Sequence, residues 1–166
     1  MNILVTGGTG FVGNPLVESL LSRGDSVTVL TRSIEKVQTI FPEKTPQFLT
    51  ALSTLKDLNA FDAVINLAGE PIFDKRWTVQ QKEKLRHSRI DLTQQIVQLI
   101  NQSEHPPFLI SGSATGIYGD GGEDVLTENS YPSSQFTAQL CINWENAAKQ
   151  ANTRVCLVRT GLVLSP

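Results

Sequence analysis

The stretch Val5-Thr6-Gly7-Gly8-Thr9-Gly10-Phe11-Val12-Gly13 decides the fold of this chain. It follows the apolar run Ile3-Leu4-Val5 and precedes a segment in which apolar residues recur every four positions, at Val12, Leu16 and Leu20. A short apolar run, a glycine turn and a period near four residues predict a strand, a tight turn and a helix. We therefore expect the chain to begin with a β–turn–α unit.

The three glycines spaced by three residues suit dinucleotide binding. Gly7 permits the tight turn, Gly10 lets a pyrophosphate approach the backbone N–H groups of the helix N-terminus, and Gly13 allows the helix to pack closely on the strand. In this context the pattern predicts a cofactor loop made of Gly7, Gly10, Phe11, Val12 and Gly13. The alternative is a plain tight turn. No Gly-Lys-Ser/Thr follows, which excludes a P-loop.

Strand-like and helical segments alternate along the rest of the chain. Further strands are expected at 27–30, 47–50, 63–67, 108–110 and 155–158, and helices at about 79–101 and 136–151. Loops are expected around Pro42 and Pro46 and from Gly112 to about Pro132. This alternation predicts a Rossmann-type, doubly wound α/β domain with a parallel sheet and helices on both faces. Ligands of such folds lie beyond the carboxyl ends of the strands.

The composition indicates a packed domain and excludes several classes of protein. The chain has 166 residues, of which 40% are hydrophobic, and a net charge of −2, which suits one domain and gives no reason to expect nucleic acid or an anionic membrane as a partner. No apolar run approaches the ~20 residues of a membrane span, and no signal sequence precedes the first strand. Cys141 and Cys156 form neither a metal pattern nor a disulfide framework. We expect a cytoplasmic domain without a metal site.

The end of the second strand predicts which cofactor is preferred. An acidic residue there bonds the ribose 2′-hydroxyl of NAD, whereas an arginine accommodates the 2′-phosphate of NADP. This strand ends in Thr31-Arg32-Ser33, and the first acid is Glu35. A guanidinium can bond a phosphate through two parallel hydrogen bonds. We therefore predict NADP(H) over NAD(H); the alternative is that Arg32 is a solvated residue at the start of a helix.

The glycine string resembles the start of the extended short-chain dehydrogenase/reductase superfamily. Other stretches are similar to one atypical branch of it, the "epimerase family protein" group of nucleotide-sugar epimerase-like proteins. These stretches are Asn66-Leu67-Ala68-Gly69-Glu70-Pro71-Ile72, Arg76-Trp77, 111–120, Leu140-Cys141, Trp144-Glu145 and 159–164. The resemblance covers essentially the whole chain and implies a Rossmann fold that binds NADP(H).

The resemblance adds residues to the expected cofactor site. Leu67, Ala68 and Gly69 would line the path of the ribose and pyrophosphate, and Glu70 would bond a ribose hydroxyl or else be a local cap. Arg76 begins a basic stretch that suits a phosphate-bearing ligand, although a solvated helix face is the alternative. Thr31 and Leu52 complete the expected site. Ser88-Arg89 occupies the place of an asparagine in the superfamily, so the helix kink found there need not be kept.

Only part of the superfamily's catalytic set has a match. Ser113 corresponds to the serine that bonds the substrate oxygen, although a loop-capping serine is the alternative. A tyrosine and a lysine four residues on normally transfer the proton, with the ammonium lowering the pKa of the phenol and binding the nicotinamide ribose. Taking Glu145 as the glutamate four residues past the lysine puts Thr137 and Cys141 in these two places. The usual proton relay is therefore absent.

Other side chains are weaker substitutes for the missing pair. Cys141 would supply a thiol acid or base, but a buried cysteine is more often inert. Tyr118 would protonate a substrate oxygen or simply pack in its loop. His87 and His105 are expected at the surface, and Trp144 in the core.

Two functions remain open. One is an NADP(H)-dependent oxidoreductase or epimerase that acts on a small, possibly phosphate-bearing substrate; the other is a non-catalytic NADP(H)-binding sensor or partner-binding module. The chain stops at Val163-Leu164-Ser165-Pro166, directly after a strand-like run, whereas chains of the group continue into a C-terminal substrate-binding lobe. We therefore expect residues 1–166 to be the cofactor domain alone, inactive without that lobe. The sequence does not indicate an oligomeric state.

Overall fold

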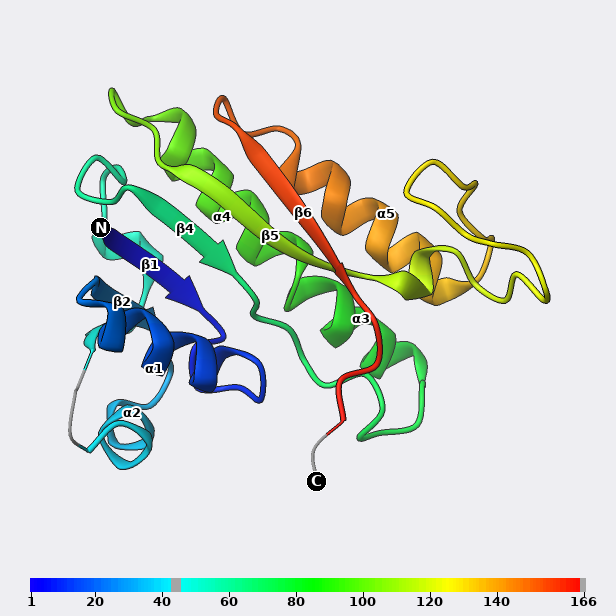
Figure 1. Ribbon diagram of the computed structural model, residues 1–166, viewed down its shortest axis with the longest axis horizontal. Helices are drawn as coiled ribbons and strands as arrows, with labels where there is room; N and C mark the ends of the chain where they lie inside the picture. Colours follow the sequence, from blue (N-terminus) through cyan, green and yellow to red (C-terminus); the bar gives the residue numbers. More distant parts are fainter. Residues whose placement is uncertain (43–45, 165–166) are drawn as a thin grey trace.

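Six parallel strands form a single sheet in this computed structural model, which describes residues 1–42 and 46–164 (Figure 1). The order across the sheet is β3-β2-β1-β4-β5-β6, so the direction of strand addition reverses between β1 and β4. The strands are β1 (Asn2–Thr6), β2 (Ser26–Leu30), β3 (Gln47–Leu49), β4 (Ala63–Asn66), β5 (Phe108–Ala114) and β6 (Val155–Thr160). This topology confirms the expected Rossmann-type fold.

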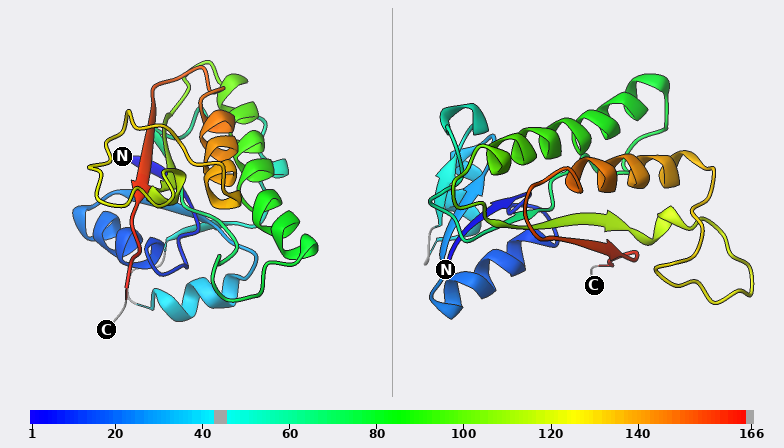
Figure 2. Two further views of the ribbon diagram at one scale, coloured as in Figure 1. Left: turned by 90° about the vertical axis from the view of Figure 1, so that its right-hand side faces the viewer. Right: turned by 90° about the horizontal axis from the view of Figure 1, so that it is seen from above.

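The helices cover the sheet unequally. Helices α1 (Gly13–Arg23) and α2 (Ile34–Ile40) lie on one face, whereas α3 (Val79–His87), α4 (Ile90–Asn101) and α5 (Phe136–Ala148) lie on the other (Figures 1 and 2). Two short 3₁₀ helices, η1 (Leu52–Thr54) and η2 (Thr115–Ile117), follow β3 and β5. Each face of the central strands therefore has its own core. Among residues 1–42 and 46–164, no helix combines the length and the apolar character that crossing a bilayer demands.

The first β–turn–α unit forms as the sequence predicts. Apolar side chains of α1, among them Val17 and Leu20, pack with Ile3 and Val5 of β1 in the core on that face. Gly24 ends the helix in the left-handed conformation (φ +89°), and its N–H donates to carbonyls of the last turn. A glycine adopts this conformation at no steric cost, which explains why α1 ends at this residue.

The expected continuous helix over 79–101 is two helices that meet at Ser88 and Arg89. The Leu85 carbonyl, which would accept from the Arg89 N–H in a continuous helix, instead accepts from the Ser88 hydroxyl (3.1 Å) and the Arg89 guanidinium (3.2 Å). The Arg89 N–H donates to the carbonyl three residues earlier (3.1 Å). The expectation that no kink need occur here was wrong, because local side-chain bonds compete with the helix.

Helix α2 lies in the segment 33–46, which was expected to be a loop broken by Pro42 and Pro46. The Ser33 hydroxyl oxygen accepts from the Lys36 N–H (3.3 Å), so it caps the helix and satisfies one free donor of the first turn. The prolines lie after the helix and do not interrupt it.

Strand β5 runs further than the expected 108–110. It continues through Gly112 to Ala114, because β6 pairs with it as far as Thr160. A Cβ on Gly112 would lie 3.0 Å from the Trp144 ring, so the absent side chain lets α5 pack closely here. The loop expected from Gly112 therefore begins later.

Strand β6 is covered on one face only. Its side chains alternate between half-buried and exposed, with Cys156 exposed and Val158 39% exposed. The helices on both faces of the sheet therefore do not extend over both faces of this edge strand in the described part of the chain. The chain end at Ser165 and Pro166 lies outside the described residues.

A chain of buried hydrogen bonds joins four elements across the sheet. The Thr6 hydroxyl donates to the Asn66 side-chain oxygen (2.6 Å), and the Asn66 amide donates to the Thr93 hydroxyl oxygen (2.7 Å). The same oxygen accepts from the Trp144 indole N–H (2.9 Å), while the Thr93 hydroxyl donates to the Arg89 carbonyl (2.6 Å). One hydroxyl thus satisfies two buried donors and contacts one acceptor.

Thr93→Val tests this chain of bonds. Valine keeps the shape but removes the hydroxyl, which leaves the Asn66 amide and the Trp144 indole without an acceptor. Each unsatisfied buried donor costs about 1–3 kcal/mol, so we expect the free energy of unfolding to fall by about 2–4 kcal/mol in chemical denaturation. Thr39→Val is the control, since that hydroxyl is exposed on α2 and bonds only a carbonyl of its own helix. Equal losses for the two variants would contradict the role of Thr93.

Candidate functional site

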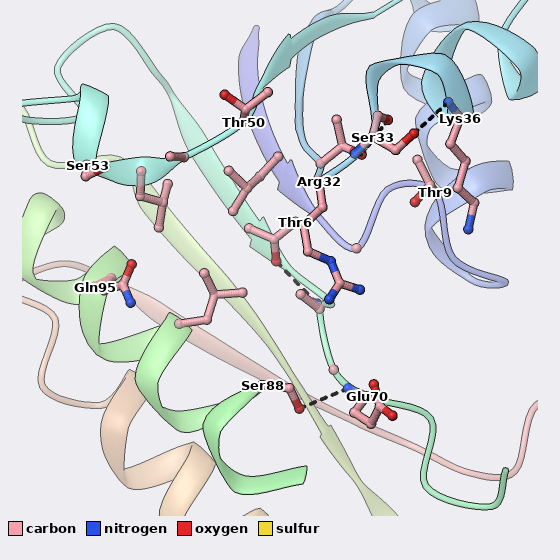
Figure 3. Close-up of a pocket in the computed structure, with 18 of the residues that line it drawn as sticks. Thr6, Thr9, Arg32, Ser33, Lys36, Thr50, Ser53, Glu70, Ser88 and Gln95 are labelled. Atoms are coloured by element: carbon pink, nitrogen blue, oxygen red, sulfur yellow. Dashed lines mark hydrogen bonds between the residues drawn. The ribbon is translucent and has the colours of Figure 1, made fainter. Parts of the chain in front are cut away.

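A cavity of about 560 Å³ opens at the carboxyl ends of β1, β2 and β4, where the strand order reverses (Figure 3). This is where open α/β sheets bind their ligands. Seven of the residues expected to bind a cofactor line it: Gly7, Thr31, Arg32, Leu52, Ala68, Gly69 and Glu70. The other expected residues, Gly10, Phe11, Val12, Gly13, Leu67 and Arg76, are not part of its lining.

The glycine loop packs directly against the end of β4. Gly7 has φ +72°, and a Cβ there would lie 2.8 Å from the backbone of Leu67 and Ala68. A Cβ on Gly13 would lie only 2.1 Å from the Gly7 carbonyl oxygen. These two positions therefore exclude side chains, as expected for the tight turn and for the close packing of α1. Phe11 is 55% exposed at the tip of the loop.

Two cations lie at the end of β2. The Arg32 side chain extends from this strand into the cavity, and Lys36 of α2 lines the same end (Figure 3). Thr31 holds the turn between them, because its hydroxyl donates to the Ser33 carbonyl (2.9 Å) and accepts from the Ser33 N–H (3.1 Å). Within residues 1–42 and 46–164, neither cation has a hydrogen-bonding or ion-pair partner for its charged group.

Lys36 was not among the residues expected from the sequence. The sequence predicts a loop for the segment that contains Lys36. It therefore does not indicate that Lys36 lies one helical turn after Ser33, near Arg32. The cap formed by Ser33 is the signal that identifies it, since a serine directly before a helix puts the third residue on at the first turn.

The opposite wall of the cavity is apolar. Leu52 of η1 is 4% exposed, and Leu92 of α4 and Leu30 at the end of β2 pack against the same hydrophobic core and line the cavity with it. Such surfaces suit a flat ring system rather than a charged group. Leu92 and Gln95 were missed, because they lie on a helix whose apolar pattern indicated only a core.

Glu70 and Arg76 do not come together. The Glu70 carboxylate accepts from the Lys75 ammonium (3.1 Å), and hydrogen bonds from Lys75 and Gln81 lower its pKa. Its backbone N–H donates to the Ser88 hydroxyl oxygen (2.9 Å). Arg76 is exposed on the loop before α3. In this structure the Glu70 carboxylate therefore makes the contact of a surface acid, paired with Lys75 at the rim of the cavity.

Ser113 lies in a second, buried group of polar residues. It is 4% exposed, and its hydroxyl donates to the Glu145 carboxylate (2.7 Å). The same carboxylate accepts two bonds from the Arg159 guanidinium, at 2.7 and 2.9 Å, and Arg159 also donates to the Tyr118 hydroxyl oxygen (2.6 Å). We call Ser113, Glu145, Arg159 and Tyr118 the β5–β6 polar cluster. In the sequence Glu145 and Arg159 belong to two separate motifs, and neither motif indicates that the two side chains pair.

The electrostatics of the β5–β6 polar cluster keep Glu145 ionised. Burial raises the pKa of this carboxyl, but the hydrogen bonds from Arg159 and Ser113 outweigh burial and hold it below its usual value. The hydrogen bonds that the Arg159 guanidinium donates to this carboxylate in turn raise the pKa of Arg159. The pair is therefore fully charged at neutral pH although Glu145 is 2% exposed.

Thr137 and Cys141 lie on the first two turns of α5, next to this cluster. Cys141 is buried, and burial raises the pKa of its thiol while hydrogen bonds from the Ala114 backbone and the Ser113 side chain offset part of the rise. Of the other candidates, Trp144 is in the core, and His87 and His105 are exposed. His87 bonds Asp91 across the break between α3 and α4 (2.6 Å) and is not part of the cavity lining.

Comparison with known proteins agrees with this geometry. Residues 3–166 match the model of the NAD dependent epimerase/dehydratase family. The chain is 39% identical to the Epimerase family protein SDR39U1 homolog, chloroplastic, of Arabidopsis thaliana, over 99% of the chain and 49% of the relative. The chain spans about half the length of the curated relatives it matches.

Two solved structures share the fold over the same length. The crystal structure of human epimerase family protein SDR39U1 (isoform 2) with NADPH has a TM-score of 0.85 and 30% identity, covering 99% of this chain and 55% of that one. The nucleoside-diphosphate sugar epimerase from Corynebacterium glutamicum has a TM-score of 0.78 and 32% identity, covering 99% and 34%.

Arg159→Met tests the electrostatics of the β5–β6 polar cluster. Removing the guanidinium leaves the buried carboxylate with only the Ser113 hydroxyl (2.7 Å) and the more distant Lys149 ammonium (3.8 Å), so we expect the free energy of unfolding to fall by about 3 kcal/mol at pH 7. In the wild type the stability contributed by Glu145 is present above its usual pKa of 4.5 and is lost as the pH falls through the lower folded value. In the variant burial still raises the pKa of the Glu145 carboxyl, and only Ser113 and Lys149 oppose it. The carboxyl is therefore protonated at a higher pH, and the difference in the free energy of unfolding from the wild type narrows on acidification.

The measurement is chemical denaturation at a series of pH values. Arg23→Met is the control, because Arg23 pairs with Asp25 at the surface and such pairs contribute about 0–1 kcal/mol. A gap between Arg159→Met and the wild type that stays constant or widens as the pH falls would contradict the role given to Glu145.

Proposed function

The chain belongs to the NAD dependent epimerase/dehydratase family, and from this premise we propose that it binds NADP(H), in preference to NAD(H), in the cavity beside β1, β2 and β4. The observation that supports the preference is the pair of cations, Arg32 and Lys36, at the end of β2. The human relative solved with NADPH also supports it. The cofactor supplies a hydride acceptor or donor; the protein supplies its binding and orientation.

The pyrophosphate of the cofactor would lie over the glycine loop. Gly10 leaves open space, since a Cβ there would have only the Gly7 carbonyl oxygen nearby (3.1 Å). The loop runs directly into α1, whose N-terminal N–H groups and dipole favour an anion. Phe11, Val12 and Gly13 contribute backbone at this point. Gly13 acts by packing, because it lets the start of α1 approach β1.

The adenosine half would occupy the outer part of the cavity. The apolar walls formed by Leu52 and Leu92 suit the adenine ring, and the 2′-phosphate would lie between Arg32 and Lys36. Thr31 positions these cations through its two bonds to Ser33. Leu67, Ala68 and Gly69 would carry the cofactor across the end of β4, with Glu70 and Arg76 at the outer rim.

Arg32→Ala tests the cofactor preference. We expect the wild-type chain to bind NADPH more tightly than NADH in fluorescence titrations. The variant should lose about 1.5–3 kcal/mol of that difference, the size of a charge-assisted hydrogen bond. Lys36→Ala should act in the same direction. NADH affinity is the internal control and should change little, because NADH has no 2′-phosphate. Equal wild-type affinities for the two cofactors would refute the use of Arg32.

For the whole protein we propose an oxidoreductase or epimerase that acts on a small phosphate-bearing substrate. The sugar-nucleotide chemistry named for the Corynebacterium relative supports this class. Ser113 would face the substrate oxygen, and Thr137 and Cys141 would stand where the superfamily has its tyrosine and lysine. The walls that hold the substrate would come from a C-terminal lobe of the kind the relatives' greater length allows.

A specific observation favours the second candidate, a non-catalytic NADP(H)-binding module. The Ser113 hydroxyl donates to Glu145 (2.7 Å) and is 4% exposed, so it is not free to bond a substrate. Cys141 beside it is buried as well. These contacts suit a structural role for the residues that the superfamily uses in catalysis.

Isotope transfer separates the two candidates. The full-length protein is incubated with NADPH deuterated at C4 of the nicotinamide and with a metabolite extract, and products are followed by mass spectrometry. We expect deuterium in a metabolite that gains a hydroxyl in place of a carbonyl, with Ser113→Ala reducing the transfer at least tenfold. Bound cofactor with no transferred deuterium, and no epimerised metabolite when NADP⁺ replaces NADPH, would instead support the binding module.

A further inference from the structure

Arg89 lies at the break between α3 and α4, beside the loop that follows the carboxyl end of β4. A Cβ on Gly69 would lie 2.8 Å from the central guanidinium carbon of Arg89. Arg89 donates from Nη2 to the Glu70 carbonyl (3.0 Å) and from Nη1 to the Leu85 carbonyl (3.2 Å). The guanidinium therefore lies directly against the loop that follows β4, at the same edge of the sheet as the cavity.

The charge of this guanidinium is not neutralised. All its hydrogen-bond acceptors in the described part of the chain are neutral oxygens: two carbonyls and, at 3.4 Å, the Ser88 hydroxyl. The Glu70 carboxylate acts on Arg89 only at longer range and is bonded to Lys75. Burial lowers the pKa of the Arg89 guanidinium, which shows that its surroundings do not favour the charge. A half-buried cation without an anion is costly, which makes Arg89 a candidate for a role toward a ligand.

On its other side Arg89 faces α5. Its guanidinium carbon lies 5.4 Å from the centre of the Trp144 ring, and its charge acts on the Cys141 thiol. The Ser113 side chain in turn lowers the pKa of the Cys141 thiol, against the rise that burial causes. Cys141 is the residue that the sequence comparison puts in the place of the superfamily's lysine. A positive charge is thus present beside that place, although it comes from another element.

The orientation of the cofactor follows from its 2′-phosphate. With the adenosine end at Arg32 on β2, a dinucleotide crosses the reversal point and extends its nicotinamide end toward β4 and β5. Gly69, Arg89 and Ser113 lie on that side. Oxidised nicotinamide carries a positive charge on its ring, whereas reduced nicotinamide does not, so a nearby cation distinguishes the two forms.

We propose that Arg89 supplies the positive charge at the nicotinamide end of the site, from the α3–α4 break instead of from α5, and makes the site favour NADPH over NADP⁺. The proposal rests on the proposed function, because it needs a bound NADP(H) with its adenosine end at Arg32. It makes Arg89 a residue that sets the redox preference of the bound cofactor.

The test compares dissociation constants for NADP⁺ and NADPH, measured by calorimetry on this chain. The 2′-phosphate is common to both ligands, so its contribution cancels in the ratio Kd(NADP⁺)/Kd(NADPH). We expect Arg89→Gln to lower this ratio roughly three- to tenfold, the effect of one charge at several ångströms in a partly solvated site. Arg89→Lys should keep the ratio. Arg154→Gln is the matched control, because the Arg154 guanidinium also lies over an aromatic ring, that of Phe108 (5.4 Å), but at the amino ends of the strands, away from the cavity.

A second pair of variants covers the case in which Arg89→Gln does not fold. Cys141→Asp puts a carboxylate next to Arg89, so the ratio should fall as in Arg89→Gln, while Cys141→Ser should leave it unchanged. If neither ligand binds the wild-type chain, the proposed function fails. If NADPH binds more tightly than NADH in a way that depends on Arg32, but the ratio Kd(NADP⁺)/Kd(NADPH) is unchanged in Arg89→Gln and in Cys141→Asp, the proposed function stands and this inference is overturned.

Discussion

The rest of the structure depends on one buried hydroxyl. Thr93 is fully buried, and its oxygen accepts from Asn66 and Trp144 while its proton goes to the Arg89 carbonyl. These bonds use every hydrogen-bonding capacity the hydroxyl has, so β4, α4 and α5 can meet in only one relative position. The chain of bonds continues to Thr6, whose hydroxyl oxygen accepts from the Ala68 N–H (3.2 Å). The loop that borders the cavity is therefore positioned from the core.

The same constraint explains how a charged residue is kept near the cavity. The Arg89 carbonyl is held by Thr93, and its guanidinium is held by two further carbonyls, so neither end of the residue is free to turn to solvent. The Arg89 side chain both contributes to the break between α3 and α4, by bonding the Leu85 carbonyl, and places its guanidinium against Gly69. The fold thus stabilises an arrangement that an isolated helix would not adopt.

Local patterns in the sequence were sufficient for the fold, and for the half of the site that lies next to the glycine turn. The β1–turn–α1 unit, the parallel sheet and Arg32 at the end of β2 depend on residues close together in the chain. Helix α2 and the break at Ser88 were missed because side-chain caps, not apolar periodicity, determine them. The pair Glu145–Arg159 was missed for a different reason: it joins α5 to β6, and only the packed structure shows that a helix acid faces a strand cation.

The charged groups of Arg32 and Lys36 at the end of β2 differ from those of Glu70 and Arg89, which are bonded to neighbouring residues. Arg32 and Lys36 are exposed, and their charged groups have no bond to the described part of the chain. By contrast, a Cβ added to Gly7 or Gly13 would lie 2.8 or 2.1 Å from backbone atoms of the chain. Substitutions at the cations therefore leave the core unchanged, while almost any substitution at the glycines displaces α1. Changes at these two exposed positions therefore alter the charge of the cavity at the end of β2 without displacing the glycine loop or α1.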